Sequence, residues 1–163
     1  MSDTLEEARK MIAAQRTQPG GVDCPCCGQL VKIYKRKLNS TMARALVLIY
    51  QYFEIPPSYR EEWFHGPSHS VWSTSGGDAA KLRHWGLIEG RPGERPDGST
   101  HTGFFRITDK GRDFVLGMVR VPQHVLLFNQ NRFGFSFETT NIYEALGDKF
   151  NYNELMSTGA NVV

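Results

Sequence analysis

The stretch SGGDAAKLRHWGLIEG, Ser75–Gly90, changes its pattern at a single glycine. Ahead of Gly86, small and apolar residues recur at the helical period of about 3.6 residues. After it, Leu87 and Ile88 begin an extended segment, and Gly86 itself tolerates the left-handed conformation that ends many helices. We predict one helix over Ser75–Trp85 that leads into the first strand of a hairpin.

The next residues predict the rest of that hairpin and a further helix. RPGERPDGSTHTG, residues 91–103, is rich in the proline and glycine that form turns. FFRI, Phe104–Ile107, is expected to pair antiparallel with residues around Leu87–Glu89. A helix is then predicted to begin at Thr108 or Asp109, because both residue types cap helices.

NSTMARALVLIYQYF, residues 39–53, predicts a buried helix. It opens with polar residues that cap helix N-termini, and its apolar residues repeat at helical spacing. The residues in that repeat are Met42, Leu46, Ile49 and Phe53. The prolines of EIPPS end the helix, since proline lacks the backbone N–H that a helix needs.

SDTLEEARKMIAAQR, near the start of the chain, predicts an N-terminal helix outside the main pattern. Thr4 and Glu7 have the spacing of a capping box, and acidic residues fill the first turn. The apolar stripe of this helix would consist of Leu5, Ala8 and Ile12. The helix could pack on the core or on a second copy of the chain, which leaves a homodimer open.

The segment from Val121 onward predicts a strand, an irregular aromatic stretch and a helix at roughly 140–146. The aromatic stretch, FGFSFETTNIY, places Phe133, Phe135 and Phe137 at alternate positions. These phenylalanines either pack into the core or form a surface for a protein partner. The sequence leaves both interpretations open.

Several of these residues carry a resemblance to a known fold: Leu82, Gly86, Leu87, Ile88, Ile107, Thr108 and Gly111. In chain order they are a helix that contains Leu82, the sequence Gly-Leu-Ile at its end, the hairpin called the wing, and the sequence Ile-Thr-x-x-Gly after it. This phrase resembles the core of winged-helix repressors of the multiple-antibiotic-resistance type, over about residues 40–119. The resemblance implies an α+β fold with a winged helix-turn-helix core.

Four regions follow from the resemblance and from the patterns around it. We expect an N-terminal helix or arm at 1–21, a cysteine knuckle and basic strand at 22–39, and the winged-helix domain at 40–120. A small C-terminal αβ extension at 121–163 would pack on the core. The whole sequence also resembles small phage-encoded proteins that join a CPxCG knuckle and YKRKLNS to a winged helix and end in a tail like GDKFNYNELM.

The basic residues predict where such a protein would contact double-stranded DNA. From Cys24 to Phe53 there are five basic residues and no acidic one. The candidate contacts are Lys32, Lys35, Arg36 and Lys37 on the strand, Ser73, Lys81, Arg83 and His84 on the helix face, and Arg91, Arg95 and His101 on the wing. Strand alternation would send Lys35 and Lys37 to one side and Arg36 to the other. The alternative is an ordinary solvated surface.

The cysteines predict a metal site that is only half present. Cys24 and Cys27 have C-x-x-C spacing, and Gly28 can make the turn that a zinc knuckle needs. Since no second cysteine pair exists, His65 and His69 would have to complete a structural zinc site. A knuckle without metal, or with a single histidine, is the alternative.

Composition and missing motifs narrow the function classes. Three cysteines within four positions cannot make a disulfide framework, and no apolar run reaches the ~20 residues of a membrane span. We therefore expect a soluble, cytoplasmic chain. No motif of a hydrolase, zinc protease or phosphate-binding loop is present, so we expect no enzyme. The prediction is a double-stranded DNA-binding regulator of transcription or replication. The alternative is a phage-type module that binds and modulates a host protein.

Overall fold

The computed structural model of the chain describes residues 4–18, 20–75, 77–93, 103–128 and 131–157. Its α-helices are α1 (Leu5–Gln15), α2 (Ser40–Glu54), α3 (Ser70–Ser73), α4 (Asp109–Val115), α5 (Ile142–Leu146) and α6 (Tyr152–Ser157). Its 3₁₀ helices are η1 (Pro57–Tyr59), η2 (Gly66–Ser68) and η3 (Asp78–Trp85). The strands are β1 (Val22–Asp23), β2 (Leu30–Val31), β3 (Tyr34–Lys37), β4 (Phe64–His65), β5 (Ile88–Gly90), β6 (Phe104–Ile107), β7 (Val121–Pro122), β8 (His124–Phe128), β9 (Asn131–Phe135) and β10 (Thr139–Thr140). The fold is mixed α+β with small antiparallel sheets.

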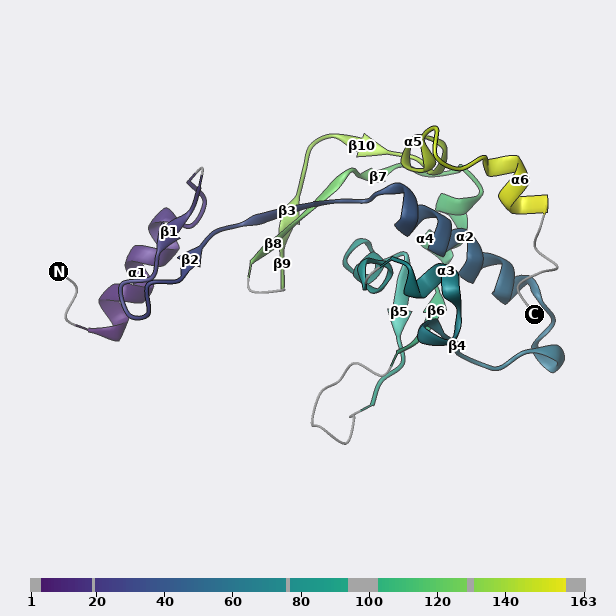
Figure 1. Cartoon of the computed structure of the whole chain (residues 1–163), viewed down its shortest axis with the longest axis horizontal. Helices are drawn as coiled ribbons and strands as arrows, with labels where there is room; N and C mark the ends of the chain where they lie inside the picture. The colour runs from purple at the N-terminus through teal and green to yellow at the C-terminus, as the bar shows by residue number, and fades with distance from the viewer. Residues whose placement is uncertain (1–3, 19, 76, 94–102, 129–130, 158–163) are drawn as a thin grey trace.

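A three-stranded sheet in the order β4-β6-β5 lies next to α2 and η3 (Figure 1). β5 pairs with β6 through Ile88 and Ile107, which confirms the predicted hairpin. On the other edge of β6, Phe105 pairs with Phe64 of β4. α4 begins at Asp109, as predicted, because the Thr108 side chain caps it.

The prediction of one helix over Ser75–Trp85 is wrong at its start. η3 begins only at Asp78, because Gly77 has a left-handed conformation with φ of 90° that a helix does not continue. η3 also has 3₁₀ rather than α-helical geometry. Ser75 instead joins α3 to η3: its Oγ donates to Trp72 O at 2.7 Å and accepts from Ala79 N at 3.1 Å. The end of the helix is as predicted, with Gly86 in the left-handed conformation.

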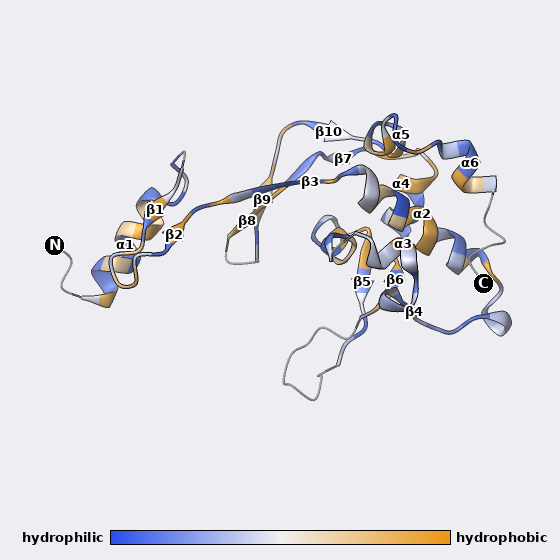
Figure 2. Ribbon diagram, in the orientation of Figure 1, coloured by the Kyte–Doolittle hydropathy of each residue, from blue (hydrophilic) through white to orange (hydrophobic). Residues whose placement is uncertain are grey.

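α2 forms the centre of the core, and hydrophobic residues from η3, the sheets and the C-terminal helices gather around it (Figure 2). Its predicted apolar residues, Met42, Leu46, Ile49 and Phe53, are all buried. α2 begins after Asn39, whose Oδ1 accepts from Met42 N at 2.9 Å. The predicted buried helix is therefore confirmed.

A second antiparallel sheet, in the order β3-β8-β9, joins the basic strand to the C-terminal segment. Val125 and Leu127 of β8 are buried, so this sheet shares the core of α2. The prediction of an irregular aromatic stretch is wrong, because Asn131–Phe135 forms strand β9. Its Phe135 pairs with Val125 of β8, the strand just before it in the sequence.

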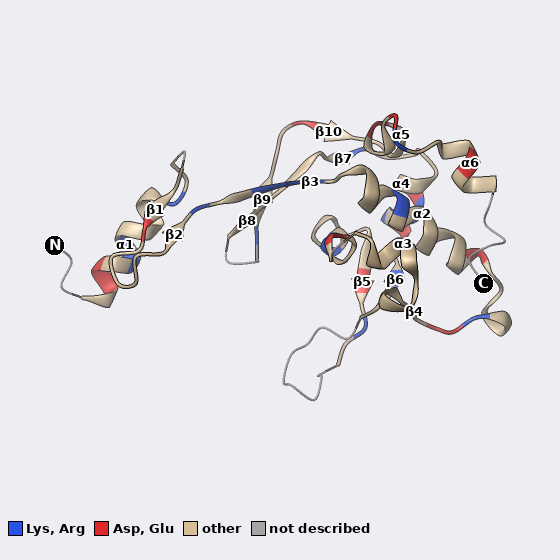
Figure 3. Ribbon diagram, in the orientation of Figure 1, with Lys and Arg blue, Asp and Glu red and all other residues tan. Residues whose placement is uncertain are grey.

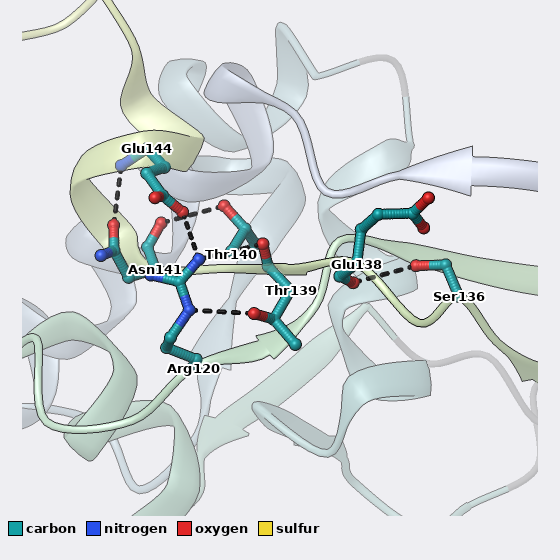
Figure 4. A network of polar contacts seen from close by, with 7 residues as sticks. All are labelled: Arg120, Ser136, Glu138, Thr139, Thr140, Asn141 and Glu144. Carbon is teal, nitrogen blue, oxygen red and sulfur yellow. Dashed lines mark hydrogen bonds and ion pairs between the residues drawn. The ribbon is translucent and has the colours of Figure 1, made fainter.

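A polar network fixes the C-terminal helix α5 to strands β7 and β10 (Figure 4). The Arg120 guanidinium donates to Thr139 Oγ1 at 2.9 Å and to Thr139 O at 3.1 Å, and it pairs with Glu144 Oε2 at 2.7 Å. Asn141 Oδ1 accepts from Glu144 N at 2.8 Å and caps α5. The helix predicted at roughly 140–146 is thereby confirmed.

α1 and the β1–β2 hairpin form an arm at one end of the molecule, which β3 connects to the rest (Figure 1). The Thr4 side chain accepts from Glu7 N at 3.1 Å, as the capping box predicts. The predicted apolar stripe is only partly correct, since Ala8 is buried but Leu5 is 58% exposed. Within the described residues, no helix is long and apolar enough to cross a bilayer.

Candidate nucleic-acid interface

The last turns of η3 present basic side chains, as the sequence predicts. Arg83 is exposed, while Lys81 and His84 are half-buried. Lys81 Nζ forms an ion pair with Asp78 Oδ1 at 2.8 Å, so the acidic residue at the start of η3 is neutralised by a neighbour on the same helix. The positive charge therefore increases toward the end of η3.

Sequence reasoning missed Arg132, which belongs to the same region. It extends from β9, and its Nη1 donates to His84 O at 3.1 Å. The alternation in NRFGF could have identified β9 as a strand, but nothing local in the sequence places Arg132 beside η3. We call Lys81, Arg83, His84 and Arg132 the η3 cluster.

The η3 cluster affects the charge state of its histidine. Burial lowers the pKa of His84, and the nearby positive charges of Arg83, Arg132 and Lys81 lower it further. The lowered pKa favours the neutral form of His84. A phosphate anion close to this cluster would raise the pKa of His84 again.

The basic strand β3 divides its charges between two sides, as strand alternation predicts. Lys35, Arg36 and Lys37 are all exposed, and Figure 3 shows the continuous basic run. In the register with β8, Lys37 lies opposite His124, on the same side as Lys35. Burial lowers the pKa of His124 most, and Lys35 and Lys37 add to the effect, which agrees with this shared side.

Arg36 and Lys32 are on the opposite side of the strand from the two lysines. Both line a groove of about 550 Å³ between the arm and the β3-β8-β9 sheet, together with Tyr34 and Phe128. Lys32 Nζ lies 4.9 Å from the centre of the Tyr34 ring. One flat duplex surface therefore cannot contact all four residues of the basic run.

The remaining predicted DNA contacts are only partly described. Ser73 is on α3, not on η3, and its Oγ donates to Pro67 O at 3.2 Å, so the predicted shared face of Ser73 and Lys81 on one helix is wrong. Arg91 stacks on Phe104, with its guanidinium carbon 3.8 Å from the ring centre. Arg95 and His101 lie outside the described residues.

The cysteines form a tight turn between β1 and β2. Cys24 N donates to Gln29 O at 2.7 Å, and Gly28 N donates to Cys24 O at 2.8 Å. Gly28 has a φ of 75°, which fulfils the predicted need for glycine. The backbone N–H groups of Cys26 and Cys27 donate to the Cys24 thiol and lower its pKa, which favours the thiolate.

The predicted zinc site of Cys24, Cys27, His65 and His69 is not assembled. No three His, Cys, Asp or Glu side chains in the described parts of the chain come together in a way that could hold a metal ion. His65 belongs to β4, which pairs with β6, while both cysteines are in the arm (Figure 1). His69 stacks on Phe64 at 4.4 Å, and burial lowers its pKa.

None of the protein-family models, curated proteins or solved structures with which the chain was compared matches it.

Proposed function

We propose that residues 40–119 form a winged helix that binds double-stranded DNA. The order α2, β4, α3, η3, β5, β6 supports this proposal, since it alternates helices and strands as a helix-turn-helix followed by a wing does. In this arrangement η3 is the recognition helix and β5–β6 is the wing. The resemblance of the segment from Leu82 to Gly111 to winged-helix repressors also favours this proposal.

The main support for the proposal is the hydrogen bond between Arg132 and the end of η3. Residues distant in sequence place positive charge around one exposed helix end, at a 3.1 Å hydrogen bond between Arg132 and His84. Exposed arginine and lysine side chains are the usual partners of DNA phosphates, and arginine also contacts guanine edges. The η3 cluster can therefore provide both positioning and base contacts.

The 3₁₀ geometry of η3 is compatible with this role. At a rise of about 2 Å per residue, its eight residues span roughly 16 Å, and the helix is narrower than an α-helix. The major groove of DNA is about 12 Å wide. Since Ala79, Leu82 and Trp85 face the core, Lys81, Arg83 and His84 are left to approach a groove.

A salt series tests the proposal directly. Fluorescence anisotropy with a labelled random duplex should show binding at low salt that weakens as salt rises. Arg132→Gln should flatten the slope of log K against log salt by about one unit, because one phosphate contact releases about one counterion. Lys149→Gln, which removes one exposed positive charge on the turn after α5, is the matched control and should leave the slope unchanged.

Absence of binding at low salt would reject DNA binding. An equal effect of Arg132→Gln and Lys149→Gln would reject the η3 cluster as the contact surface and leave only non-specific attraction. Selection of bound sequences from a random pool then tests base readout. Lys81→Gln should change the selected sequence, since Lys81 would contact base edges.

A second candidate function rests on the exposed phenylalanines of the C-terminal segment. Phe133, Phe135 and Phe137 are 46%, 36% and 102% exposed, so the interpretation that they pack into the core is wrong. Exposed aromatic residues are typical of protein interfaces. If the chain is an interaction module, replacing these three residues with serine should abolish capture of one host protein from nuclease-treated lysate. DNA binding would then be unaffected.

A further inference from the structure

The β1–β2 turn has the form of half of a tetrahedral metal site. Cys24 and Cys27 lie on a tight turn closed by two backbone hydrogen bonds, from Cys24 N to Gln29 O at 2.7 Å and from Gly28 N to Cys24 O at 2.8 Å. Structural zinc is bound by four ligands, most often thiolates and imidazoles. The turn can provide two of them, so two more must come from elsewhere.

The described parts of the chain do not bring those ligands to the turn. All its cysteines lie within Cys24–Cys27. Across the described ranges, no third His, Cys, Asp or Glu side chain joins the pair in a possible metal site. His65 and His69 are in the segment around β4, and His84 and His124 contact other parts of the body.

The turn is also accessible to a second molecule. Cys27 is exposed and Cys24 is half-buried, in an arm that extends from one end of the chain (Figure 1). Leu30 of β2, next to the turn, is 50% exposed, and Leu5 of α1, in the same arm, is 58% exposed. These apolar side chains would lose contact with water if another arm packed against this one.

We propose that two copies of this chain share one Zn²⁺ ion, bound by Cys24 and Cys27 of each copy. The twofold axis of the dimer would pass through the ion, so that each copy contributes an identical half-site. Each of the four thiols coordinates as a thiolate and releases its proton to solvent, and no redox change occurs. The product is a closed tetrathiolate site without an open catalytic position.

A second copy is the partner that this geometry favours. A dissimilar protein would need its own exposed cysteine pair on a turn, whereas a second copy has one of identical shape. The exposed leucines beside the turn would meet their own counterparts across the axis, as in other isologous interfaces. The inference concerns the arm alone and does not rest on DNA binding by η3.

Cys26 is the internal control for the ligand set. It lies between the two ligands and is exposed, but Cys24 and Cys27 of two copies already supply the four ligands of a tetrahedral site, so the thiol of Cys26 is not needed. Cys26→Ser should therefore retain zinc and the dimer. The double variant Cys24→Ser/Cys27→Ser should lose both.

Three measurements on the full chain test the proposal, all in a phosphine reductant that prevents disulfides. Metal analysis should find about 0.5 zinc per chain. Light scattering should give about twice the 18.5 kDa of one chain, and a chelator should return the mass to that of one chain. Zinc-edge X-ray absorption should show four sulfur atoms at about 2.3 Å and no nitrogen.

Several results would overturn the proposal. One zinc per chain in a monomer would mean that a single chain completes the site, and a dimer that survives the chelator would mean that metal does not hold the copies together. Loss of zinc in Cys26→Ser would assign a third thiolate from the same chain. Wild-type protein without zinc, even after zinc is added, would exclude the site. Far-UV circular dichroism of the double variant separates loss of ligands from loss of folding, and none of these results depends on DNA.

Discussion

Gly111 of α4 lies against the strand that begins the hairpin, and replacing it with alanine tests that packing. A Cβ atom there would lie 2.1 Å from Leu87 O and 2.8 Å from Ile107 Cγ1. These distances are too short for real atoms, so α4 would have to move away from β5 and β6. Thr108 restricts this movement, because its Oγ1 donates to Gly86 O at 2.6 Å and accepts from Gly111 N at 3.0 Å.

The expected loss of stability follows from two opposing effects. Alanine is a better helix former than glycine by about 1 kcal/mol. Overpacking typically costs about 1–3 kcal/mol, and the upper end applies here because the clash is with a backbone oxygen that cannot rotate away. The free energy of unfolding of Gly111→Ala should therefore fall by about 2 kcal/mol. For a chain of this size, the melting temperature should fall by roughly 4–8 °C.

Urea and thermal unfolding, followed by far-UV circular dichroism, measure this change. Gly90→Ala is the matched control, since a Cβ at that position meets nothing closer than Phe105 Cε1 at 4.0 Å. Its unfolding free energy should change by less than about 0.5 kcal/mol. A Gly111→Ala variant as stable as the wild type would refute the close packing of α4 on β5.

Two further predictions concern stability. Trp85→Phe should lower the free energy of unfolding in urea by about 1–3 kcal/mol, because the indole is buried and its Nε1 donates to Pro122 O at 2.7 Å. Stability should also fall as the pH drops below the ordinary histidine pKa of about 6.5, since burial above all lowers the pKa values of His69, His84 and His124 in the folded chain. Below that pH, the unfolded chain binds more protons than the folded chain. The contribution of these histidines to the free energy of unfolding is therefore fully present above the ordinary pKa and is lost as the pH falls below it. Urea midpoints between pH 8 and 5 should show this loss, and it should be smaller in His69→Gln; midpoints that are constant over this range would contradict it.

The sequence predicted the elements whose signals are local. α2 carries its own cap at Asn39 and an apolar repeat that faces one side. The β5–β6 hairpin and α4 follow from a glycine stop, a turn-rich segment and the Thr108 cap. In each case, residues within one or two turns determine the structure, so the pattern is sufficient.

The incorrect predictions depend on distant contacts. β3 pairs with β8, with Tyr34 opposite Leu127, so its partner lies far along the chain. β9 pairs locally with β8, and the alternation in NRFGF could have identified it. His65 and His69 have a spacing typical of metal ligands, but His65 lies in β4 beside β6 and His69 stacks on Phe64, away from the arm. Nothing in the local sequence reports such placements. Gly77 is an exception, since two adjacent glycines before Asp78 could have indicated the later helix start.

The C-terminal segment and η3 form one body, which affects how the chain would meet a duplex. Arg132 Nη1 donates a hydrogen bond to His84 O, and Trp85 Nε1 donates one to Pro122 O. The last two residues of η3 are therefore both hydrogen-bonded to the C-terminal segment. The β3-β8-β9 sheet is part of the same core. η3, attached in this way, has a fixed position relative to the lysines of β3. Under the proposed function, phosphate contacts from the sheet and base contacts from η3 would therefore have to fit a duplex together, and this requirement would favour one register on DNA over loose electrostatic attraction.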